Sequence, residues 1–339
     1  MISLVYLAAI SLIAVILTVY DKRAAVKGAW RVKELTLLAV AAFGGSAAMF
    51  ATMLAVRHKT RRKKFMLGVP LIIAAQVLAV AVPFNQSLSV ERFSIATDKL
   101  DGEVKLALIT DLHSCSYGEA QRGLIGAIDA EQPDAVLFAG DVFDDRQPPY
   151  NTEQLMRVLA TKYACFYVAG NHDTEDEYKQ LAESMGVTVF AGTSAEFMGI
   201  RIAGIDDPDV ERYARIGSIT TTAAPYAEQL ENLRQTLTAD KFTIILSHRP
   251  ERMDEFLPMS PDLVVSGHAH GGQWRVPYIL ENGLVAPNQG FFPKYTNGAY
   301  QFGDATLIVS RGLARESTRI PRLFNRPELA IITVAGTQK

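Results

Sequence analysis

Three long stretches without a charged side chain constrain the fold of this chain more than any other feature. Residues 1–20, 35–56 and 65–83 each lack Asp, Glu, Lys and Arg. An α-helix of about 20 residues spans about 30 Å, the thickness of the hydrocarbon core of a bilayer. A helix that is apolar around its whole circumference is buried in a large protein or in a membrane. We therefore expect residues 1–83 to form an all-α transmembrane segment of about three helices.

The net charge of the chain, −2, conceals a division into two parts. Residues 1–83 contain 11 Lys and Arg residues and 2 Asp and Glu residues, whereas the rest of the chain contains 23 and 34. The excess of 11 acidic residues in the second part would repel a polyanion, so we expect no nucleic-acid partner. The two cysteines, Cys115 and Cys165, are too few for a disulfide-rich scaffold.

The basic residues of the first part lie in two loops, 21–34 and 57–64. Three simple spans would place these loops on opposite faces of a membrane, whereas the positive-inside rule places both in the cytoplasm. Either the denser loop 57–64 alone is cytoplasmic, or the middle stretch enters the membrane and returns near Gly44 and Gly45. The simpler explanation of the two glycines is close packing between helices. In both arrangements the residues after 83 lie on the outer face.

This part of the chain also resembles a family of small bacterial membrane proteins of unknown function. The resemblance implies a membrane unit whose partner is the lipid bilayer, and no activity. We therefore expect a multi-pass protein of the bacterial cytoplasmic membrane with an extracytoplasmic second part. The matching residues are Asp21-Lys22, Trp30-Arg31, Glu34, Gly44-Gly45, and Arg57-His58-Lys59-Thr60 followed by Phe65.

Short apolar stretches alternate with helix-like stretches in the second part. Continuous apolar strands between helices indicate an α/β domain, which we expect over residues 101–339 after a linker at 84–100. Each apolar stretch is followed at once by polar residues of a particular kind. They are Asp111-Leu112-His113, Gly140-Asp141, Gly170-Asn171-His172-Asp173, Ser247-His248, and Gly267-His268-Ala269-His270.

These five motifs are expected to converge, because sites in open α/β sheets form at the carboxyl ends of strands. Alternate side chains of a strand share one face, so Asp111 and His113 would point the same way, as would His268 and His270. That spacing suits two ligands of one metal or one ligand for each of two adjacent metals. A mixture of Asp, Asn and His without Cys suits Mn, Fe, Zn or Mg.

Taken together, the five motifs resemble those of the calcineurin-like metallophosphoesterases, D-x-H, G-D, G-N-H-D, H and G-H-x-H. The resemblance implies a four-layer αββα sandwich, in which two packed mixed sheets are flanked by helices, with two divalent metal ions at one edge. It implies that the first metal is held by Asp111, His113 and His270, the second by Asn171, His248 and His268, and both by Asp141. It also implies that His172 acts on the leaving-group oxygen, with Asp173 orienting it or capping the next helix.

Four further blocks, at residues 247–252, 267–273, 310–316 and 325–329, resemble one membrane-associated branch of that superfamily. This branch contains enzymes similar to UDP-2,3-diacylglucosamine pyrophosphatases. Arginine pairs with phosphate through two hydrogen bonds, and Gly-rich backbone approaches ligands closely. We expect substrate contacts at Arg249, Gly271, Gly272, Arg311 and Arg315.

The leading hypothesis from the sequence is a membrane-anchored, two-metal phosphoesterase. Its substrate would be a phosphoester or pyrophosphate that is lipid-linked or part of the cell envelope. The first alternative is a phosphodiesterase for soluble nucleotides, which a cytoplasmic domain would favour. The second alternative, from another class, is a metal-binding membrane sensor or scaffold without turnover.

Overall fold

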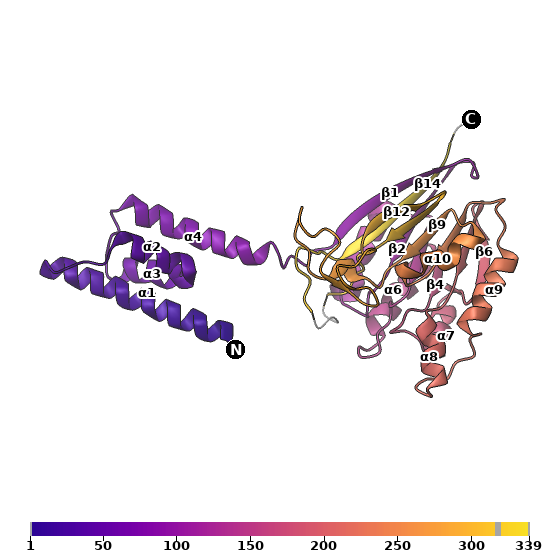
Figure 1. The fold of residues 1–339 in the computed structure, drawn as a ribbon, viewed down its shortest axis with the longest axis horizontal. Helices are drawn as coiled ribbons and strands as arrows, with labels where there is room; N and C mark the ends of the chain where they lie inside the picture. Colours follow the sequence, from indigo (N-terminus) through magenta and orange to yellow (C-terminus); the bar gives the residue numbers. More distant parts are fainter. Residues whose placement is uncertain (1, 316–319, 338–339) are drawn as a thin grey trace. The chain divides into compact units, whose positions relative to one another are not determined.

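The structure is a computed structural model that describes residues 2–315 and 320–337. The chain divides into two units, Met1–Pro83 and Phe84–Lys339 (Figure 1). The first unit is helical, and the second contains two large β-sheets and their helices.

The three apolar stretches of the first unit are helical, as predicted. Each segment is long and apolar enough to cross a membrane by length and composition. The middle segment is assembled from three consecutive helical pieces. The elements are α1 (Ile2–Lys27), α2 (Glu34–Val40), the π-helical turn η1 (Ala41–Gly45), α3 (Ser46–Ala55) and α4 (Lys63–Ala81).

The middle segment reverses its direction. Gly44 has a φ of 111°, which interrupts the helix between α2 and α3. Lys59 follows α3, and its Nζ lies 3.5 Å from Oε1 of Glu34, the first residue of α2. A straight helix over the 22 residues of this segment would hold its ends about 33 Å apart. The segment is therefore a helical hairpin, the second of the two arrangements considered from the sequence.

Gln76 of α4 supports the turn of this hairpin. Its Nε2 donates to the backbone carbonyls of Ala41 and Ala42 at 2.9 and 2.8 Å. Carbonyl groups at a helix break lose their helical partners, and an unpaired carbonyl in apolar surroundings is costly. Close packing through glycine is present as well, because a Cβ on Gly45 would lie 2.8 Å from the Cβ of Ala14.

Asp21 gathers both basic loops at the end of the unit where the hairpin opens. Its carboxylate is fully buried and lies 2.7 Å from His58 Nε2, 3.2 Å from Arg31 Nη2 and 3.4 Å from Lys59 Nζ. Loops 21–34 and 57–64 therefore lie at the same end of the unit. This arrangement satisfies the positive-inside rule for both loops at once.

Single cysteines at Ala29 and Arg61 are expected to share one accessibility, because both exposed positions lie at this end of the unit. In sealed membrane vesicles of known orientation, a membrane-impermeant maleimide should label both variants or neither. The native cysteines, Cys115 and Cys165, are buried and contribute little background. Labelling of Ala29→Cys from one side and Arg61→Cys from the other would show that the middle segment crosses the membrane.

Two six-stranded mixed sheets form the centre of the second unit. The first has the order β1-β14-β2-β3-β4-β5, in which β2 to β5 are parallel and β14 is antiparallel to β2. The second has the order β12-β13-β9-β8-β7-β6. The first sheet contains β1 (Ser89–Thr97), β2 (Glu103–Ile109), β3 (Ala135–Ala139), β4 (Ala164–Val168), β5 (Thr188–Val189) and β14 (Glu328–Gly336). The second contains β6 (Thr193–Phe197), β7 (Ile200–Gly204), β8 (Thr243–Leu246), β9 (Leu263–Ser266), β12 (Gly298–Phe302) and β13 (Ala305–Val309).

Three hydrophobic cores separate four layers, which confirms the predicted sandwich. Along β2, Leu106 and Leu108 lie in the core between the two sheets, whereas Ala107 and Ile109 lie in the core beneath the helices. A third core lies under the outer face of the second sheet. The helices are α5 (Arg122–Glu131), α6 (Tyr150–Ala160), α7 (Asp176–Ser184) and α8 (Pro208–Arg215), with α9 (Tyr226–Thr236) and α10 (Met253–Phe256) over the second sheet.

Strand β1 lies inside the stretch 84–100, which we expected to be a linker. It pairs in parallel with β14 over nine residue pairs, from Ser89↔Glu328 to Thr97↔Gly336. Edge strands carry exposed charged residues, here Glu91 and Arg92. Those charges break the apolar run by which the other strands are recognisable. The connection from α4 to β1 is therefore only residues 82–88.

Candidate metal centre

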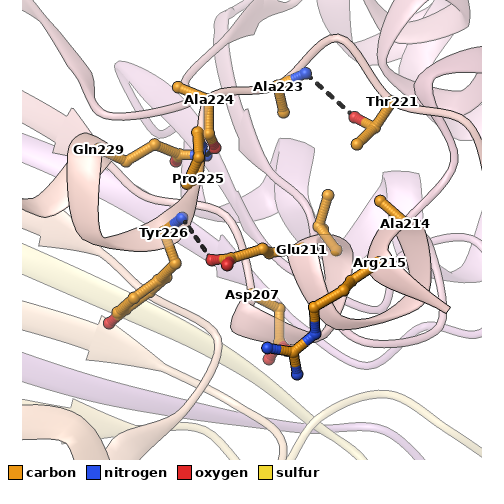
Figure 2. A pocket seen from close by; sticks show the side chains of 11 residues that line it. Asp207, Glu211, Ala214, Arg215, Thr221, Ala223, Ala224, Pro225, Tyr226 and Gln229 are labelled. Carbon is orange, nitrogen blue, oxygen red and sulfur yellow. Dashed lines mark hydrogen bonds between the residues drawn. The ribbon is translucent and has the colours of Figure 1, made fainter.

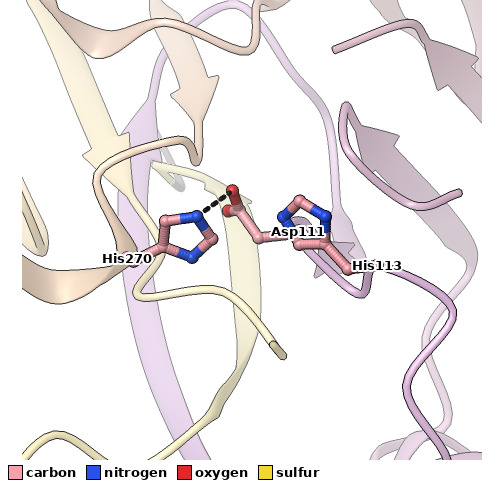
Figure 3. A group of neighbouring side chains, drawn as sticks. All are labelled: Asp111, His113 and His270. Carbon is pink, nitrogen blue, oxygen red and sulfur yellow. Dashed lines mark ion pairs between the residues drawn. The ribbon is translucent and has the colours of Figure 1, made fainter. Parts of the chain in front are cut away.

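The five motifs follow the ends of β2, β3, β4, β8 and β9, and the structure brings them together at one edge of the second unit. Their ligand atoms form two groups. In each group, one nitrogen or oxygen atom of every residue lies within 4.8 Å of the others. The first group is Asp111, His113 and His270 (Figure 3), and the second is Asp141, His248 and His268.

Asp141 lies between the two groups. Its Oδ2 is 3.1 Å from His248 Nε2 in its own group and 3.6 Å from His113 Nε2 in the other. Its Oδ1 accepts a hydrogen bond from the backbone N–H of His172 at 2.8 Å. A carboxylate in this position has the oxygens needed to bind two cations at once.

Three buried atoms at this centre have no hydrogen-bond partner within the described residues: His113 Nε2, Asn171 Oδ1 and His270 Nδ1. A buried polar atom without a partner costs about 1–3 kcal/mol. Imidazole nitrogen and amide oxygen are both common ligands of divalent ions. The residues therefore fit metal binding, and a donor set of Asp, Asn and His admits several divalent metals.

At this centre some side chains favour their charged form and others favour their neutral form. Burial opposes ionisation of Asp141, yet His248 and His113 lower the pKa of this carboxyl well below its ordinary value. Burial likewise opposes protonation of His248, but Asp141 raises the pKa of this imidazole to about 10. Burial, with neighbouring charged imidazoles, lowers the pKa of His268 and of His270 well below the usual range. These two imidazoles are thus neutral, the form that offers a lone pair to a metal.

Backbone strain is concentrated at the same residues. Left-handed backbone costs a non-glycine residue about 1–2 kcal/mol and clusters at functional sites. Five motif residues adopt it with φ between 45° and 66°: Asp111, His113, Asp141, His268 and His270.

Strand alternation was the wrong reason for expecting paired side chains. Strand β2 ends at Ile109 and β9 ends at Ser266, so the motif residues lie beyond the strands. Left-handed turns orient them instead. As a result, Asp111 and His113 join the same group, whereas the two histidines of the last motif join different groups.

Two glycines make room for the carboxylates. A Cβ on Gly170 would lie 2.2 Å from Asp141 Oδ1, and a Cβ on Gly267 would lie 2.3 Å from Asp111 Oδ2. Any larger residue would displace the carboxylates, so these positions require glycine for space.

His172 is oriented by Asp145. The His172 ring is one-third exposed, and its Nδ1 lies 2.8 Å from Asp145 Oδ1. Because its backbone N–H is bonded to Asp141, the ring is held at the rim of the centre with Nε2 free of this contact. The sequence did not identify this partner, because Asp145 lies 27 residues before His172 and spacing alone does not show which acid reaches the ring.

Asp173 has a different task from either of those predicted. Its carboxylate is fully buried and accepts from the backbone N–H groups of Val142 and Gly170, which joins the loops after β3 and β4. Helix α7 begins at Asp176, with Glu175 before it, so Asp173 does not cap it. Burial raises the pKa of Asp173 to about 6, and the negative charge of Asp141 acts in the same direction.

Two of the histidines in these groups are oriented by a second contact through their other ring nitrogen. His113 Nδ1 lies 2.8 Å from Asp144 Oδ2, and His248 Nδ1 lies 3.0 Å from the Ala139 carbonyl. Such contacts select the tautomer and the orientation of an imidazole ligand.

The buried Arg322 holds a loop beside the first group, a role that its position in the sequence did not predict. It donates to the carbonyls of Arg311, Gly312 and Ala314. A Cβ on Gly312 would lie 2.6 Å from that of Asp111, so Arg322 holds a loop packed against the first group.

The arginines expected to bind substrate are already paired within the protein. Arg249 forms two hydrogen bonds with Asp207, at 2.6 and 2.8 Å, and contacts Asp209. Arg311 pairs with Glu328 at 2.6 Å.

The other three residues expected to contact substrate are Arg315, Gly271 and Gly272. Arg315 donates to the Ser116 carbonyl. Gly271 and Gly272 are buried, and a Cβ on either would collide with Asn325 or with the Asn282 backbone. The structure therefore shows the three arginines paired within the protein, and substrate contacts at these five residues stay a prediction.

A hollow of about 280 Å³ lies between α8 and α9, apart from the centre (Figure 2). Its lining includes Glu211, Arg215 and Tyr226, and contains none of the six residues of the two groups.

Comparison with known proteins agrees with this geometry. Residues 104–272 match the family model of calcineurin-like phosphoesterases. The second unit carries a calcineurin-like phosphoesterase domain. Residues 11–65 match a family described only as of unknown function, in agreement with the resemblance of the first unit.

Two of the relatives are metallophosphoesterases by name. The chain is 27% identical over 301 residues to the uncharacterized metallophosphoesterase YkuE of Bacillus subtilis, covering 82% of this chain and 99% of that protein. It is 28% identical over 262 residues to an uncharacterized metallophosphoesterase of Aquifex aeolicus, covering 74% and 92%. A dimetal phosphatase of Danio rerio is similar with a TM-score of 0.41 and 14% identity, covering 63% of this chain and 88% of that one. The family and the ligand groups together identify a metal-dependent phosphoester hydrolase, and the hypothesis of a sensor without turnover is set aside.

Asp145→Asn and Asp173→Asn are expected to have separate effects. Asp145→Asn should lower kcat about 10–100-fold, because the ring of His172 loses the partner that orients it. Asp173→Asn should lower the free energy of unfolding by about 1–3 kcal/mol, because one of two buried N–H groups loses its acceptor. The measurements are kcat on a chromogenic phosphoester and the melting temperature of the full chain in detergent. A large loss of stability in Asp145→Asn, with kcat unchanged, would contradict the role given to Asp145.

Proposed function

We propose that this protein is a membrane-anchored phosphoesterase with two divalent metal ions, acting on a lipid-linked or cell-envelope phosphoester or pyrophosphate. Residues 1–83 would form its membrane domain and residues 84–339 its catalytic domain. One observation carries the proposal: the same chain has two adjacent ligand groups joined by Asp141 and three apolar helical segments.

The donor set assigns each residue a part in holding the metals. Asp111, His113 and His270 would hold one ion, Asn171, His248 and His268 the other, and Asp141 both. Two such ions supply positive charge that offsets the negative charge developing on a phosphoryl group and make water a stronger nucleophile.

The chain's own residues supply the proton chemistry. With Nδ1 of His172 engaged by Asp145, Nε2 is the nitrogen that can carry a proton to the leaving-group oxygen. The partial exposure of His172 leaves room for a substrate beside it.

Metal-dependent hydrolysis tests the proposal. The full chain in detergent, stripped by a chelator and reloaded with Mn²⁺, Fe²⁺, Zn²⁺ or Mg²⁺, should hydrolyse p-nitrophenyl esters only after reloading. His172→Ala should lower kcat about 10²–10⁴-fold with metal content unchanged, whereas Asn171→Ala should also reduce bound metal. Glu119→Ala, at an exposed position, serves as the matched control. Unchanged turnover in His172→Ala would refute its role.

The substrate is tested by competition between two classes of ester. A lipid-linked pyrophosphate in mixed micelles should be hydrolysed with a higher kcat/KM than a soluble nucleotide diester. The reverse preference would favour the nucleotide phosphodiesterase.

The arrangement of the first unit supports an outward-facing catalytic domain. The basic loops, which the positive-inside rule places in the cytoplasm, lie at the start of α4, and α4 then leads to the other end of the unit. In intact spheroplasts, Glu119→Cys should therefore react with an impermeant maleimide, and Arg61→Cys should react only after lysis. Reaction of Arg61→Cys alone would place the catalytic domain in the cytoplasm.

A further inference from the structure

An exposed apolar surface directly follows the last metal-ligand motif. Between residues 274 and 292 the only charged residues are Arg275 and Glu281. Tyr278 is 95% exposed, Ile279 83%, and Phe291 and Phe292 72% each. Single exposed apolar residues are ordinary, whereas a contiguous set marks an interaction site. The apolar surface consists of Trp274, Val276, Tyr278, Ile279, Phe291 and Phe292.

This surface is held firmly beside the candidate metal centre. The N–H of Leu284 donates to the Gly272 carbonyl at 2.9 Å, and the N–H of Phe292 donates to the Leu284 carbonyl at 2.9 Å. Asn288, in the turn between β10 (Val285–Ala286) and β11 (Gly290–Phe291), has its Oδ1 3.4 Å from His268 Nε2. The exposed aromatic rings are therefore fixed at the same edge as the ligand groups.

The segment that leads into the second unit, just before β1, lies near the same edge. The N–H of Arg275 donates to the Leu323 carbonyl, and Asn325 donates to the Gln273 carbonyl. A few residues further along the same segment, Arg326 donates to the carbonyls of Ser87 and Leu88, immediately before β1. The seven residues 82–88 that lead from α4 to this edge can span no more than about 25 Å.

We propose that the apolar surface inserts into the headgroup region of the bilayer in which α1 to α4 are embedded. The inference rests on the membrane anchoring of the proposed function. Trp and Tyr favour the membrane interface, the surface has few charges to desolvate, and the exposed Lys294 beside it can meet anionic headgroups. Docking would hold the metal centre at the level of lipid phosphates.

Trp274 provides a built-in reporter, because the chain has only two tryptophans. Trp30→Phe leaves Trp274 alone, and the full-length variant can be placed in vesicles of phospholipids brominated along their acyl chains. Trp274 emission should be quenched, more by bromine near the headgroups than by bromine at the chain ends, as expected for shallow insertion. A variant that also carries Trp274→Phe gives the background.

A double substitution tests the surface itself. In the Trp30→Phe background, Phe291→Ser with Phe292→Ser should lose most of the quenching of Trp274. Ile216→Ser, at a position 64% exposed at the end of α8, is the matched control and should leave the quenching unchanged. Both variants should hydrolyse a soluble p-nitrophenyl ester at the rate of the parent, which shows that they are folded.

Absence of quenching in the Trp30→Phe chain would overturn the proposal. A parent that is a dimer in detergent, and that becomes monomeric with Phe291→Ser and Phe292→Ser, would also overturn it, because a second copy would then cover the surface. The ester assay separates this inference from the proposed function. Hydrolysis without quenching refutes docking alone, whereas quenching without hydrolysis under any metal refutes the phosphoesterase and leaves docking supported.

Discussion

The Asp141 carboxylate is the contact on which the catalytic unit depends most. It lies between His113 and His248, accepts the backbone N–H of His172, and sits where a Cβ on Gly170 would be. A buried negative charge is tolerated only when it is paired or bound to a cation. The strands around Asp141 must therefore end close to one another, so that the loops after them bring positive charge to its carboxylate. The left-handed backbone at the motif residues is the cost of that convergence.

The first unit follows the same physical rule with another buried carboxylate. Asp21 draws together two basic loops that are distant along the chain. At the far end of the hairpin, Gln76 supplies hydrogen bonds to carbonyls that the broken helix leaves unpaired. An apolar surrounding makes each of these contacts stronger and each unpaired group more costly. Gln76 is the only strongly polar residue of the third apolar stretch. Its presence is explained by the broken helix of the second stretch, whose carbonyls it pairs.

Local patterns predicted most of the architecture and failed where a partner is distant. Continuous apolar runs located strands such as β3 and β9, because a strand buried on both faces has no polar positions. Strand β1 was missed, since an edge strand shows half of its surface to solvent. The pairing of His172 with Asp145 was not predicted, because Asp145 lies 27 residues away along the chain, whereas Asp173 is the adjacent residue and contacts other groups.

By itself, the sequence determined the division into an apolar basic part and an acidic α/β part, and the residues of the five motifs, whose resemblance to a known family implied the four-layer class. Those features depend on composition, periodicity and order along the chain, which are local. Only the tertiary structure decided that the middle apolar segment turns back and that an apolar surface lies beside the metal centre. It also decided that Arg249 and Arg311 form ion pairs with carboxylates of the protein itself. Each of these depends on which distant groups meet in space, and no spacing along the chain encodes that directly.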